Sequence, residues 1–366
     1  MPKLDTPLKL SPVYKPKIWG RNDLAPLFNS PSQTHNDGSV KGNSANTSSD
    51  HKDLIGEVWI TDECSKFLNG PVAGMTLAEA SAQFGSELHG SGWKHSRFPL
   101  LAKYIFTSDW LSVQVHPDDQ YAATHEPGNF GKCEMWYFLQ AEPQAEILLG
   151  LKAGTTAEML RSACESGTSK TLLCSFHPRN GEAVFIPPGT VHALGPGLVL
   201  FEVEENSDIT YRLDDFGRMG LDGKPRPLHL DKGFEVVKPD LPPYRNLPRL
   251  LVQEKFSLRR YVTASRYFAL EEFTLWKTTH FESVSERVET LSILSGEGRV
   301  ETASGWLGYH AGDTWIIPPG AGRYRLSPVE KTQLLKFYVP NLENDFRSPL
   351  ARRKFKAEEV KKVLFD

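Results

Sequence analysis

The stretch from Leu111 to Leu139 sets the strongest constraint on how this chain can fold. Its first residues, LSVQVH, alternate apolar and polar side chains, which is the period-two pattern of a β-strand with two different faces. Gln114 and His116 therefore project from one face. Proline and two aspartates then end this strand, because proline cannot donate a hydrogen bond to a sheet and aspartate favours turns. A second strand begins at Glu134, and its apolar and aromatic run is typical of a strand packed inside a β-sandwich.

Polar side chains at Gln114, His116 and Glu134 lead into these apolar strands. Buried polar groups need partners, and a metal ion can satisfy all three. Further along, a strand at residues 183–186 runs into a Pro-Pro-Gly turn, which presents His192 at the head of the next strand. Two imidazoles, one carboxylate and one amide oxygen form a nitrogen and oxygen ligand set without thiolate. Such a set suits catalytic zinc, with Mn, Fe, Co or Ni as competitors, and we expect one ion per chain.

Short strands broken by Gly and Pro turns continue along the chain and predict a mainly β protein of sandwich or jelly-roll type. A weak internal repeat divides it, because ETLSILSGEGRVE followed by GYHAGDTWIIPPGAGRYRL resembles EMWYFLQAEPQAE followed by NGEAVFIPPGTVHAL. In this alignment Glu289 matches Glu134 and Arg323 matches His192. A guanidinium has no lone pair available for a cation, so we expect the second copy to bind no metal and Glu289 to pair with a nearby Arg or Lys.

The repeat predicts two β-domains with a small helical insertion in the first. Polar residues dominate one stretch of the first domain, which cannot bury enough surface to offset its ordering entropy and is expected to be a mobile loop. The predicted parts are a first, metal-binding domain at 1–240 with the mobile loop at 29–53 and the helical insertion at 153–177, a second domain at 249–340, and a helical C-terminal tail at 341–366. Residues 4–20 are expected to lie extended on the surface of the first domain, and the Pro-rich stretch 238–248 is the expected linker.

Two Thr-x-x-Glu capping boxes predict short helices. The first box, Thr76 to Glu79, opens a helix that is expected to end near Gly85. The second, Thr155 to Glu158, opens a helix inside the insertion, and residues 172–176 after it are expected to be helical or mixed.

Composition places the chain among ordinary globular proteins, with 366 residues, 39% hydrophobic and 24% charged. Lys and Arg total 42 against 45 Asp and Glu, and the net charge of -3 gives no field of the kind that nucleic-acid binders use. No stretch approaches the apolar length of a membrane span, and the N-terminus lacks the apolar region of a signal peptide. The four cysteines have no CxxC spacing, so free thiols in a reducing compartment are expected. We therefore expect a cytoplasmic protein without a nucleic-acid or membrane partner.

Four stretches carry a family resemblance. LSVQVHPDD, GKCEMWY, FIPPGTVHALGPG and ENSDITYRLDDFGR resemble the signature stretches of the type I mannose-6-phosphate isomerases, metal-dependent members of the cupin superfamily. The resemblance runs, with a gap, from residue 19 to residue 218, and the second half of the chain is similar only to a generic cupin-like domain. It implies two cupin-like domains and an enzyme that interconverts mannose 6-phosphate and fructose 6-phosphate. It also implies that the zinc ligands are Gln114, His116, Glu134 and His192.

The resemblance further implies roles for residues around this metal site. Arg212 would be the catalytic arginine, Lys132 and Glu202 would line the pocket, and Ser112 falls where the family can contact the substrate phosphate. Moving a proton between C1 and C2 of the sugar passes through a cis-enediolate, whose negative charge a guanidinium can stabilise because it keeps its own proton. Without the resemblance, Arg212 would be read as part of a surface salt bridge. Glu202 or Lys132 could be the base, and Lys132 could instead hold the phosphate as a point charge.

Two other function classes stay open. An iron-dependent cupin oxygenase would consume O2, and a sugar-binding cupin without turnover would bind its ligand unchanged. Anaerobic incubation with mannose 6-phosphate separates these classes from an isomerase, which alone would form fructose 6-phosphate. The expected partner is a small phosphosugar, and the expected oligomeric state is a monomer or a weak homo-oligomer.

Overall fold

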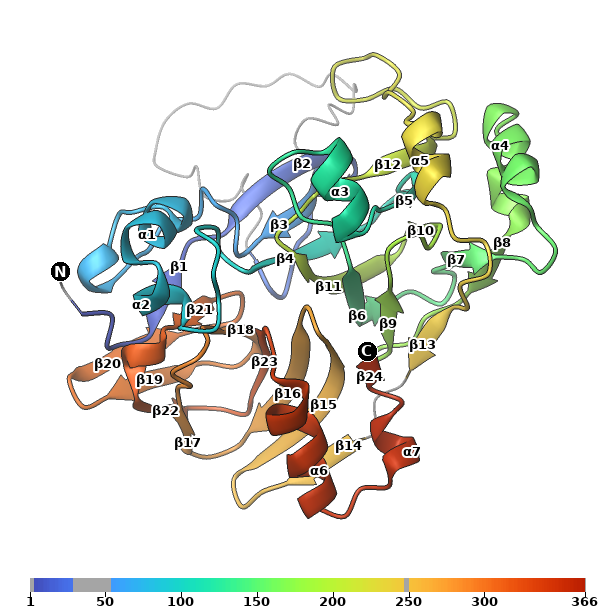
Figure 1. The fold of residues 1–366 in the computed structure, drawn as a ribbon. Coiled ribbons are helices and arrows are strands. Elements are labelled where there is room, and N and C mark those ends of the chain that lie inside the picture. Colours follow the sequence, from blue (N-terminus) through green and yellow to red (C-terminus); the bar gives the residue numbers. More distant parts are fainter. Residues whose placement is uncertain (1–2, 29–53, 247–249, 366) are drawn as a thin grey trace, which may run out of the picture.

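A computed structural model describes residues 3–28, 54–246 and 250–365, and Figure 1 shows how its sheets are arranged. The mobile loop expected at 29–53 lies outside these described residues. The first half of the molecule is a sandwich of two antiparallel sheets. The larger sheet contains, in spatial order, β13 (Tyr244–Asn246), β9 (Ala183–Ile186), β6 (Glu134–Ala141), β11 (Leu198–Glu205), β4 (Leu100–Phe106), β3 (Ile55–Trp59) and β2 (Val13–Arg21). The smaller contains β12 (Tyr211–Asp214), β5 (Val113–Val115), β10 (His192–Leu194), β7 (Ile147–Leu151) and β8 (Leu173–Phe176).

The second half is another sandwich, so the predicted mainly β fold with two sandwiches is confirmed. Its larger sheet contains β1 (Leu8–Leu10), β21 (Thr314–Ile317), β18 (Glu289–Ser295), β23 (Thr332–Tyr338), β16 (Ala269–Leu275), β15 (Ser257–Ser265) and β14 (Leu250–Gln253), with β24 (Leu364–Phe365) paired in parallel to β15. Its smaller sheet contains β17 (Thr279–Glu282), β22 (Arg323–Pro328), β19 (Gly298–Thr302) and β20 (Gly305–Tyr309).

Three apolar clusters hold the four sheets together as stacked layers. Within the first sandwich, Trp136 and Leu200 of the larger sheet pack with Leu149 of the smaller one, and a corresponding cluster fills the second sandwich. The third cluster lies between the two larger sheets, where Phe201 of β11 meets Phe337 of β23 with ring centroids 5.3 Å apart. Because the burial of apolar surface is favourable, these clusters stabilise one compact body in which the two sandwiches pack back to back.

The internal repeat is also present in the strand register. Glu134 at the start of β6 lies opposite Ile186 of β9, and Glu289 at the start of β18 lies opposite Ile317 of β21. The two carboxylates therefore hold equivalent places, as the alignment of the two Pro-Pro-Gly turns predicts. Glu289 is buried and contacts Arg287 at 3.0 Å and a lysine at 3.1 Å, which confirms the expected pairing.

Two segments pair with strands that the sequence does not predict for them. Residues 8–10 pair with β21 of the second sandwich, with Leu8 opposite Ile316, and only β2 of this N-terminal segment joins the first sandwich. The expected linker 238–248 contributes β13, whose Tyr244 lies opposite Phe185 of β9. Short apolar or mixed tripeptides carry no local signal for which sheet edge they join, so only the long-range pairing decides.

The helices lie at the ends and edges of the sandwiches (Figure 1). They are α1 (Leu77–Phe84), α2 (Ser86–His89), α3 (Asp119–His125), α4 (Ala157–Glu165), α5 (Leu230–Val236), α6 (Ser348–Arg352) and α7 (Ala357–Val360), with 3-10 turns at Gly70–Val72, Ser169–Leu172 and Pro319–Ala321 and a π-helical turn at Glu343–Arg347. The expected helical tail contains α6, α7 and the π-helical turn and then ends in β24. Within the described part of the chain, no helix is long and apolar enough to cross a membrane.

The first predicted capping box is confirmed, but the second is wrong, because the cap lies one residue later and the residue three positions after it is Met159, which cannot complete a box. At the start of α1 the Thr76 side chain accepts a hydrogen bond from the Glu79 backbone N–H, and the Glu79 carboxylate accepts one from the Thr76 backbone N–H. In α4 the cap is Thr156, because Thr155 belongs to the preceding turn, where its backbone N–H donates to Lys152. The insertion is thus helical over α4 and the following 3-10 turn, whereas residues 173–176 form β8.

Candidate functional site

Three neighbouring strands of the smaller sheet place their side chains in one row. Gln114 on β5 lies opposite His192 on β10 and opposite Arg212 on β12. Facing them, the larger sheet presents a second row of polar side chains, in which Glu202 of β11 lies between Lys103 of β4 and Trp136 of β6. Because side chains alternate along a strand, the residues between these polar positions point away into apolar clusters. The two rows therefore meet at one end of the first sandwich.

A cluster of ligand-type side chains lies at the base of this meeting point. His116, Glu134 and His192 bring their nitrogen and oxygen atoms within 4.8 Å of one another. The Nε2 atom of His116 lies 3.6 Å from Oε2 of Glu134, and the Nε2 atom of His192 lies 3.4 Å from Oε1. All three side chains are at most 1% exposed, so water does not solvate them.

The hydrogen bonds of the two imidazoles aim their free lone pairs into this cluster. Nδ1 of His116 lies 2.7 Å from the carbonyl oxygen of Ile209, and Nδ1 of His192 lies 2.9 Å from that of Thr190. Since a carbonyl only accepts, each Nδ1 carries the proton and each Nε2 is left with a lone pair, which is the usual arrangement of metal-binding histidines. Burial lowers the pKa of His116 and that of His192, so both rings are neutral at pH 7.

Several atoms of the cluster have no hydrogen-bond partner in the structure. They are Nε2 of His116 and both carboxylate oxygens of Glu134. Buried polar atoms without a partner cost free energy, and a divalent cation would satisfy all three at once. Gln114 stands next to them, with its amide nitrogen 3.2 Å from Nε2 of His192 and its amide oxygen accepting from Ser112 at 3.2 Å. A half-turn of the amide would bring its oxygen to the side of His192, so this donor set fits a metal ion.

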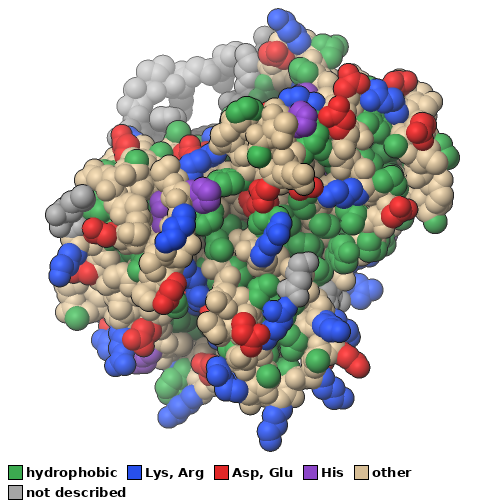
Figure 2. Space-filling view, in the orientation of Figure 1, with side chains coloured by type: hydrophobic (Ala, Val, Ile, Leu, Met, Phe, Trp, Pro, Cys, Tyr) green, Lys and Arg blue, Asp and Glu red, His purple; other side chains and the backbone are tan. Residues whose placement is uncertain are grey.

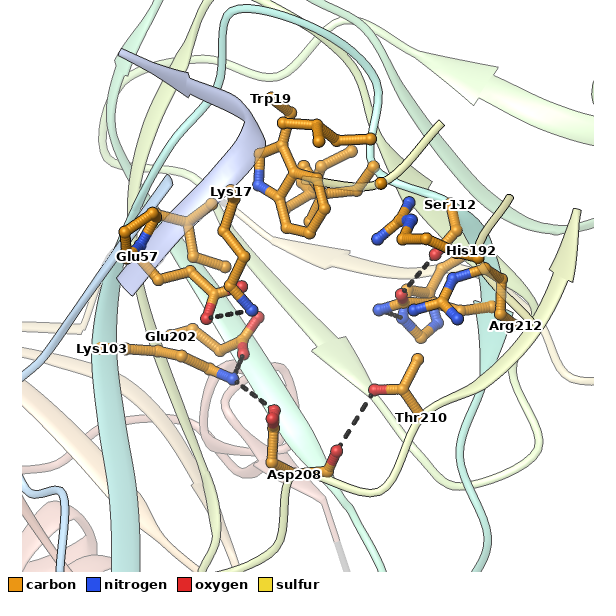
Figure 3. A pocket seen from close by; sticks show the side chains of 18 of the residues that line it. Lys17, Trp19, Glu57, Lys103, Ser112, His192, Glu202, Asp208, Thr210 and Arg212 are labelled. Atoms are coloured by element: carbon orange, nitrogen blue, oxygen red, sulfur yellow. Dashed lines mark hydrogen bonds and ion pairs between the residues drawn. The ribbon is translucent and has the colours of Figure 1, made fainter. Parts of the chain in front are cut away.

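The cluster opens into a pocket of about 560 Å³. Figure 3 shows Ser112, His192 and Arg212 along one wall and Lys103, Glu202 and Asp208 along the other. Lys132 also lines this pocket, and Trp19 covers part of its rim. The volume is in the range of small-molecule sites, and the walls carry several convergent charged groups. Over the face seen in Figure 2, by contrast, acidic and basic side chains are interspersed.

Two lysines and several carboxylates form a buried network on the second wall. Lys103 contacts Glu202 at 3.0 Å, Glu204 at 3.0 Å and Asp208 at 3.1 Å. Lys132 contacts Glu204 at 2.7 Å and Glu134 at 3.2 Å. Burial opposes the charged form of both lysines, but the surrounding carboxylates outweigh it and raise the pKa of Lys103 and that of Lys132. Both side chains are therefore ammonium groups without a lone pair.

The carboxylates of this network differ in their surroundings. Burial acts against ionisation of Glu202, but Lys103 and Lys132 lower its pKa below the ordinary value. Oε1 of Glu202 contacts Lys103, and Oε2 accepts a hydrogen bond from Trp136 at 2.7 Å. Glu202 is therefore an ionised carboxylate that is held at both oxygens. Burial raises the pKa of Glu204 against the opposing effect of the two lysines. Each oxygen of Glu204 nevertheless lies within 3.0 Å of an ammonium, which only donates, and we therefore assign Glu204 the carboxylate form as well.

Arg212 does not form the salt bridge that sequence reasoning without the family resemblance would favour. Among the described residues, no carboxylate lies within ion-pair distance of its guanidinium. Nη1 donates to the Pro227 carbonyl at 2.9 Å, and Nε has no partner. The aspartates that could have paired with it are occupied elsewhere, because Asp208 contacts Lys103 and Asp215 contacts Arg226. Arg212 thus brings an uncompensated positive charge to the pocket wall.

Six of the eight predicted site residues line this pocket, and the other two, His116 and Glu134, lie in the buried cluster with His192. Their roles as ligands, base and phosphate contacts are taken up below as proposals. Sequence reasoning missed Lys103 and Glu204, although both carried a signal. Lys103 is a single charged residue in the apolar run LLAKYIF, and Glu204 shares the side-chain parity of Glu202.

Comparison with known proteins identifies related chains. A family model described as phosphomannose isomerase type I, catalytic domain, matches residues 8–135. The mannose-6-phosphate isomerase ManA of Bacillus subtilis is 33% identical over 332 residues, which cover 87% of this chain and 95% of that protein. A mannose-6-phosphate isomerase of Streptococcus mutans is 34% identical over 322 residues, with 85% and 92% coverage.

Solved structures agree in fold over nearly the whole chain. The crystal structure of the mannose 6-phosphate isomerase from Bacillus subtilis matches with a TM-score of 0.77 at 27% identity, covering 91% of this chain and 99% of that one. A zinc-bound mannose 6-phosphate isomerase matches with a TM-score of 0.67 at 16% identity and the same coverage, which shows a shared fold.

Proposed function

The chain belongs to the type I mannose-6-phosphate isomerases, and from this membership we propose that its pocket interconverts mannose 6-phosphate and fructose 6-phosphate by moving a proton between C1 and C2. One observation supports this most strongly. Buried ligand atoms of His116 and Glu134 that lack a hydrogen-bond partner lie beside Nε2 of His192, which lines the pocket. The same pocket carries an ionised carboxylate, Glu202, and the guanidinium of Arg212, which has no carboxylate partner among the described residues. An aldose–ketose isomerase needs such a metal site, a base and a stabiliser of negative charge at one place.

We propose that Gln114, His116, Glu134 and His192 hold one zinc ion. One anionic and three neutral ligands leave net positive charge on a divalent cation, which when bound acts as a Lewis acid toward the sugar oxygens. Zinc suits this nitrogen and oxygen set, and Mn, Fe, Co and Ni are its competitors. The buried atoms of the cluster that lack a hydrogen-bond partner support the assignment.

Glu202 is the base in this proposal. The sequence left Glu202 and Lys132 open, and the structure favours Glu202 because it is ionised and lines the pocket, whereas Lys132 is an ammonium held by Glu134 and Glu204. Glu202 takes the proton from one sugar carbon and returns it to the neighbouring one. Its lowered pKa makes it a weak base, so the developing negative charge on the sugar oxygens needs strong stabilisation.

Arg212 supplies part of that stabilisation. Its guanidinium reaches the pocket without a carboxylate partner among the described residues, so its charge is available to an enediolate. Ser112, on the same wall, is proposed to contact the phosphate through its hydroxyl group. Lys132 could bind phosphate only by giving up Glu134 or Glu204, and we therefore place its charge with these carboxylates.

The test is anaerobic incubation of metal-loaded protein with mannose 6-phosphate, followed by nuclear magnetic resonance of the sugar. We expect fructose 6-phosphate to form from mannose 6-phosphate, the reverse conversion to occur when fructose 6-phosphate is supplied, and chelation of the metal to stop both. Binding of the phosphosugar without conversion would identify a binding module instead. Absence of conversion under anaerobic conditions, with conversion and O2 consumption once O2 is admitted, would identify an oxygenase.

A further inference from the structure

Glu204 is a buried carboxylate of the site that cannot touch the substrate. Its side chain is 0% exposed and does not line the pocket, whereas Lys103, Lys132 and Glu202 do. On the sheet it lies opposite Glu134, one side-chain step from Glu202 along β11. Any effect of Glu204 on the reaction must therefore act through these neighbours.

The carboxylate of Glu204 bridges the two lysines of the network. Its Oε1 lies 3.0 Å from Nζ of Lys103, and its Oε2 lies 2.7 Å from Nζ of Lys132. Neither oxygen has a hydrogen-bond partner in the structure, so these two ion contacts account for its charge. Both lysines also approach the same oxygen of Glu202, at 3.0 Å for Lys103 and 3.8 Å for Lys132. Their positive charges therefore lie close together and repel each other.

Each lysine links Glu204 to a different part of the site. Lys132 lies 3.2 Å from Oε2 of Glu134, the proposed anionic metal ligand. Lys103 lies 3.0 Å from Glu202, the proposed base. The contacts thus run in series from Glu134 through Lys132, Glu204 and Lys103 to Glu202.

We propose that Glu204 is a positioning residue that shares the charge of Lys132 with the metal-binding carboxylate of Glu134, so that Lys132 does not pair with Glu134 alone, and that holds Lys103 against Glu202. This inference rests on the proposed function for its effect on turnover, but not for its effect on metal binding. Without the charge of Glu204, the strongest remaining partner of Lys132 is Glu134, and an ammonium on that carboxylate competes with a cation. Loss of the bridge also frees the ammonium that fixes one oxygen of Glu202.

Glu204→Gln tests the proposal, because it keeps the shape of the side chain and removes its charge. Partners behind metal ligands typically affect metal affinity or activity on the order of ten- to a hundredfold. We expect the zinc affinity, measured by competition with a chelator, to fall by about tenfold. In zinc-saturated protein, we expect kcat to fall by about a hundredfold with little change in KM, because a displaced base affects the chemical step and not substrate binding. Glu204→Asp keeps the charge and should recover part of both losses.

Glu271→Gln is the matched control. Glu271 is also 0% exposed and ion-paired, to Arg259, but lies in the second sandwich. The Glu271→Gln substitution should lower the stability of the protein without changing its zinc affinity or the kcat of the folded enzyme. An equal effect of Glu271→Gln, a change confined to KM, or an unchanged zinc affinity in Glu204→Gln would each overturn the proposal. If the unaltered protein did not isomerise mannose 6-phosphate, the proposed function would fail, while the zinc affinities would still decide the role of Glu204.

Discussion

Replacing Arg212 with lysine tests the proposed charge stabilisation most directly. The substitution keeps one positive charge but removes the planar fork, whose two nitrogens can meet two sugar oxygens at once. Because Arg212 has no carboxylate partner among the described residues, the change breaks no ion pair there. Within the described part of the chain, the side-chain hydrogen bond lost is the one to the Pro227 carbonyl, worth about 1 kcal/mol, so the fold should remain intact.

The expected loss of activity is large by comparison. Removing one preorganised donor to a developing oxyanion typically costs about a hundred- to a thousandfold in kcat, which is about 2.7–4 kcal/mol of transition-state stabilisation. We therefore expect Arg212→Lys to lower kcat by at least about a hundredfold while metal content and KM change little. The assay follows fructose 6-phosphate formation over a range of mannose 6-phosphate concentrations, with elemental analysis of the same samples.

Arg218→Lys serves as the control for a nearby guanidinium. Arg218 pairs with Asp215 at 2.8 Å and with Asp109 at 3.1 Å and is not a lining residue of the pocket, so its replacement should leave kcat unchanged. An Arg212→Lys variant with normal kcat and a raised KM would refute the reasoning, because it would mean that Arg212 binds the ground state and the transition state equally well, as a phosphate contact does.

Three further expectations concern metal content and stability. His192→Ala should lose the bound metal while circular dichroism shows the fold retained, and stoichiometric metal with full activity in this variant would eliminate the assigned site. The unaltered protein should carry about one metal per chain, unchanged in Glu289→Ala, since Glu289, the counterpart of Glu134 in the second sandwich, is paired to cations; two ions, one of them lost in Glu289→Ala, would contradict this. Burial lowers the pKa of His89 from 6.5 to about 4, so the unfolded chain takes up a proton that the folded protein does not, and stability falls as the pH drops through this range. Between pH 7 and pH 5 this should cost about 2 kcal/mol in urea unfolding, a loss that His89→Leu should remove, and an equal loss in both proteins would exclude His89 as its source.

The candidate site was largely predictable because its signals are local. Strand periodicity places Gln114 and His116 on one face, and the Pro-Pro-Gly turn places His192 at the head of a strand. The repeat predicted the equivalent register of Glu134 and Glu289. Each of these signals depends on side-chain parity or turn chemistry, which a few consecutive residues determine.

The remaining features depend on pairing between distant segments. That residues 8–10 join the second sandwich follows from which edge is free in the folded molecule, not from their own sequence. The local signals of Lys103 and Glu204 gain a meaning as site residues when β4 pairs with β11, which lies far along the chain, because this pairing brings Lys103 to its carboxylates. The same holds for Arg212, which has no carboxylate partner among the described residues because Asp215 and Asp208 pair with other cations. Register between strands far apart in the chain sets these contacts, and no local pattern encodes it.

The second sandwich acts on the site through the reverse face of the same strands. Along β4, β11 and β6, each site residue has a neighbour that points the other way: Tyr104 follows Lys103, Phe201 precedes Glu202, and Met135 follows Glu134, and all three neighbours belong to the apolar cluster shared with the second sandwich. Tyr104 also forms a buried 2.6 Å hydrogen bond to Ser292 of β18. A strand cannot shift its polar residues without shifting these interface residues, and a close-packed interface resists such movement. The second sandwich is therefore a rigid support that keeps Lys103, Glu202 and Glu134 in register.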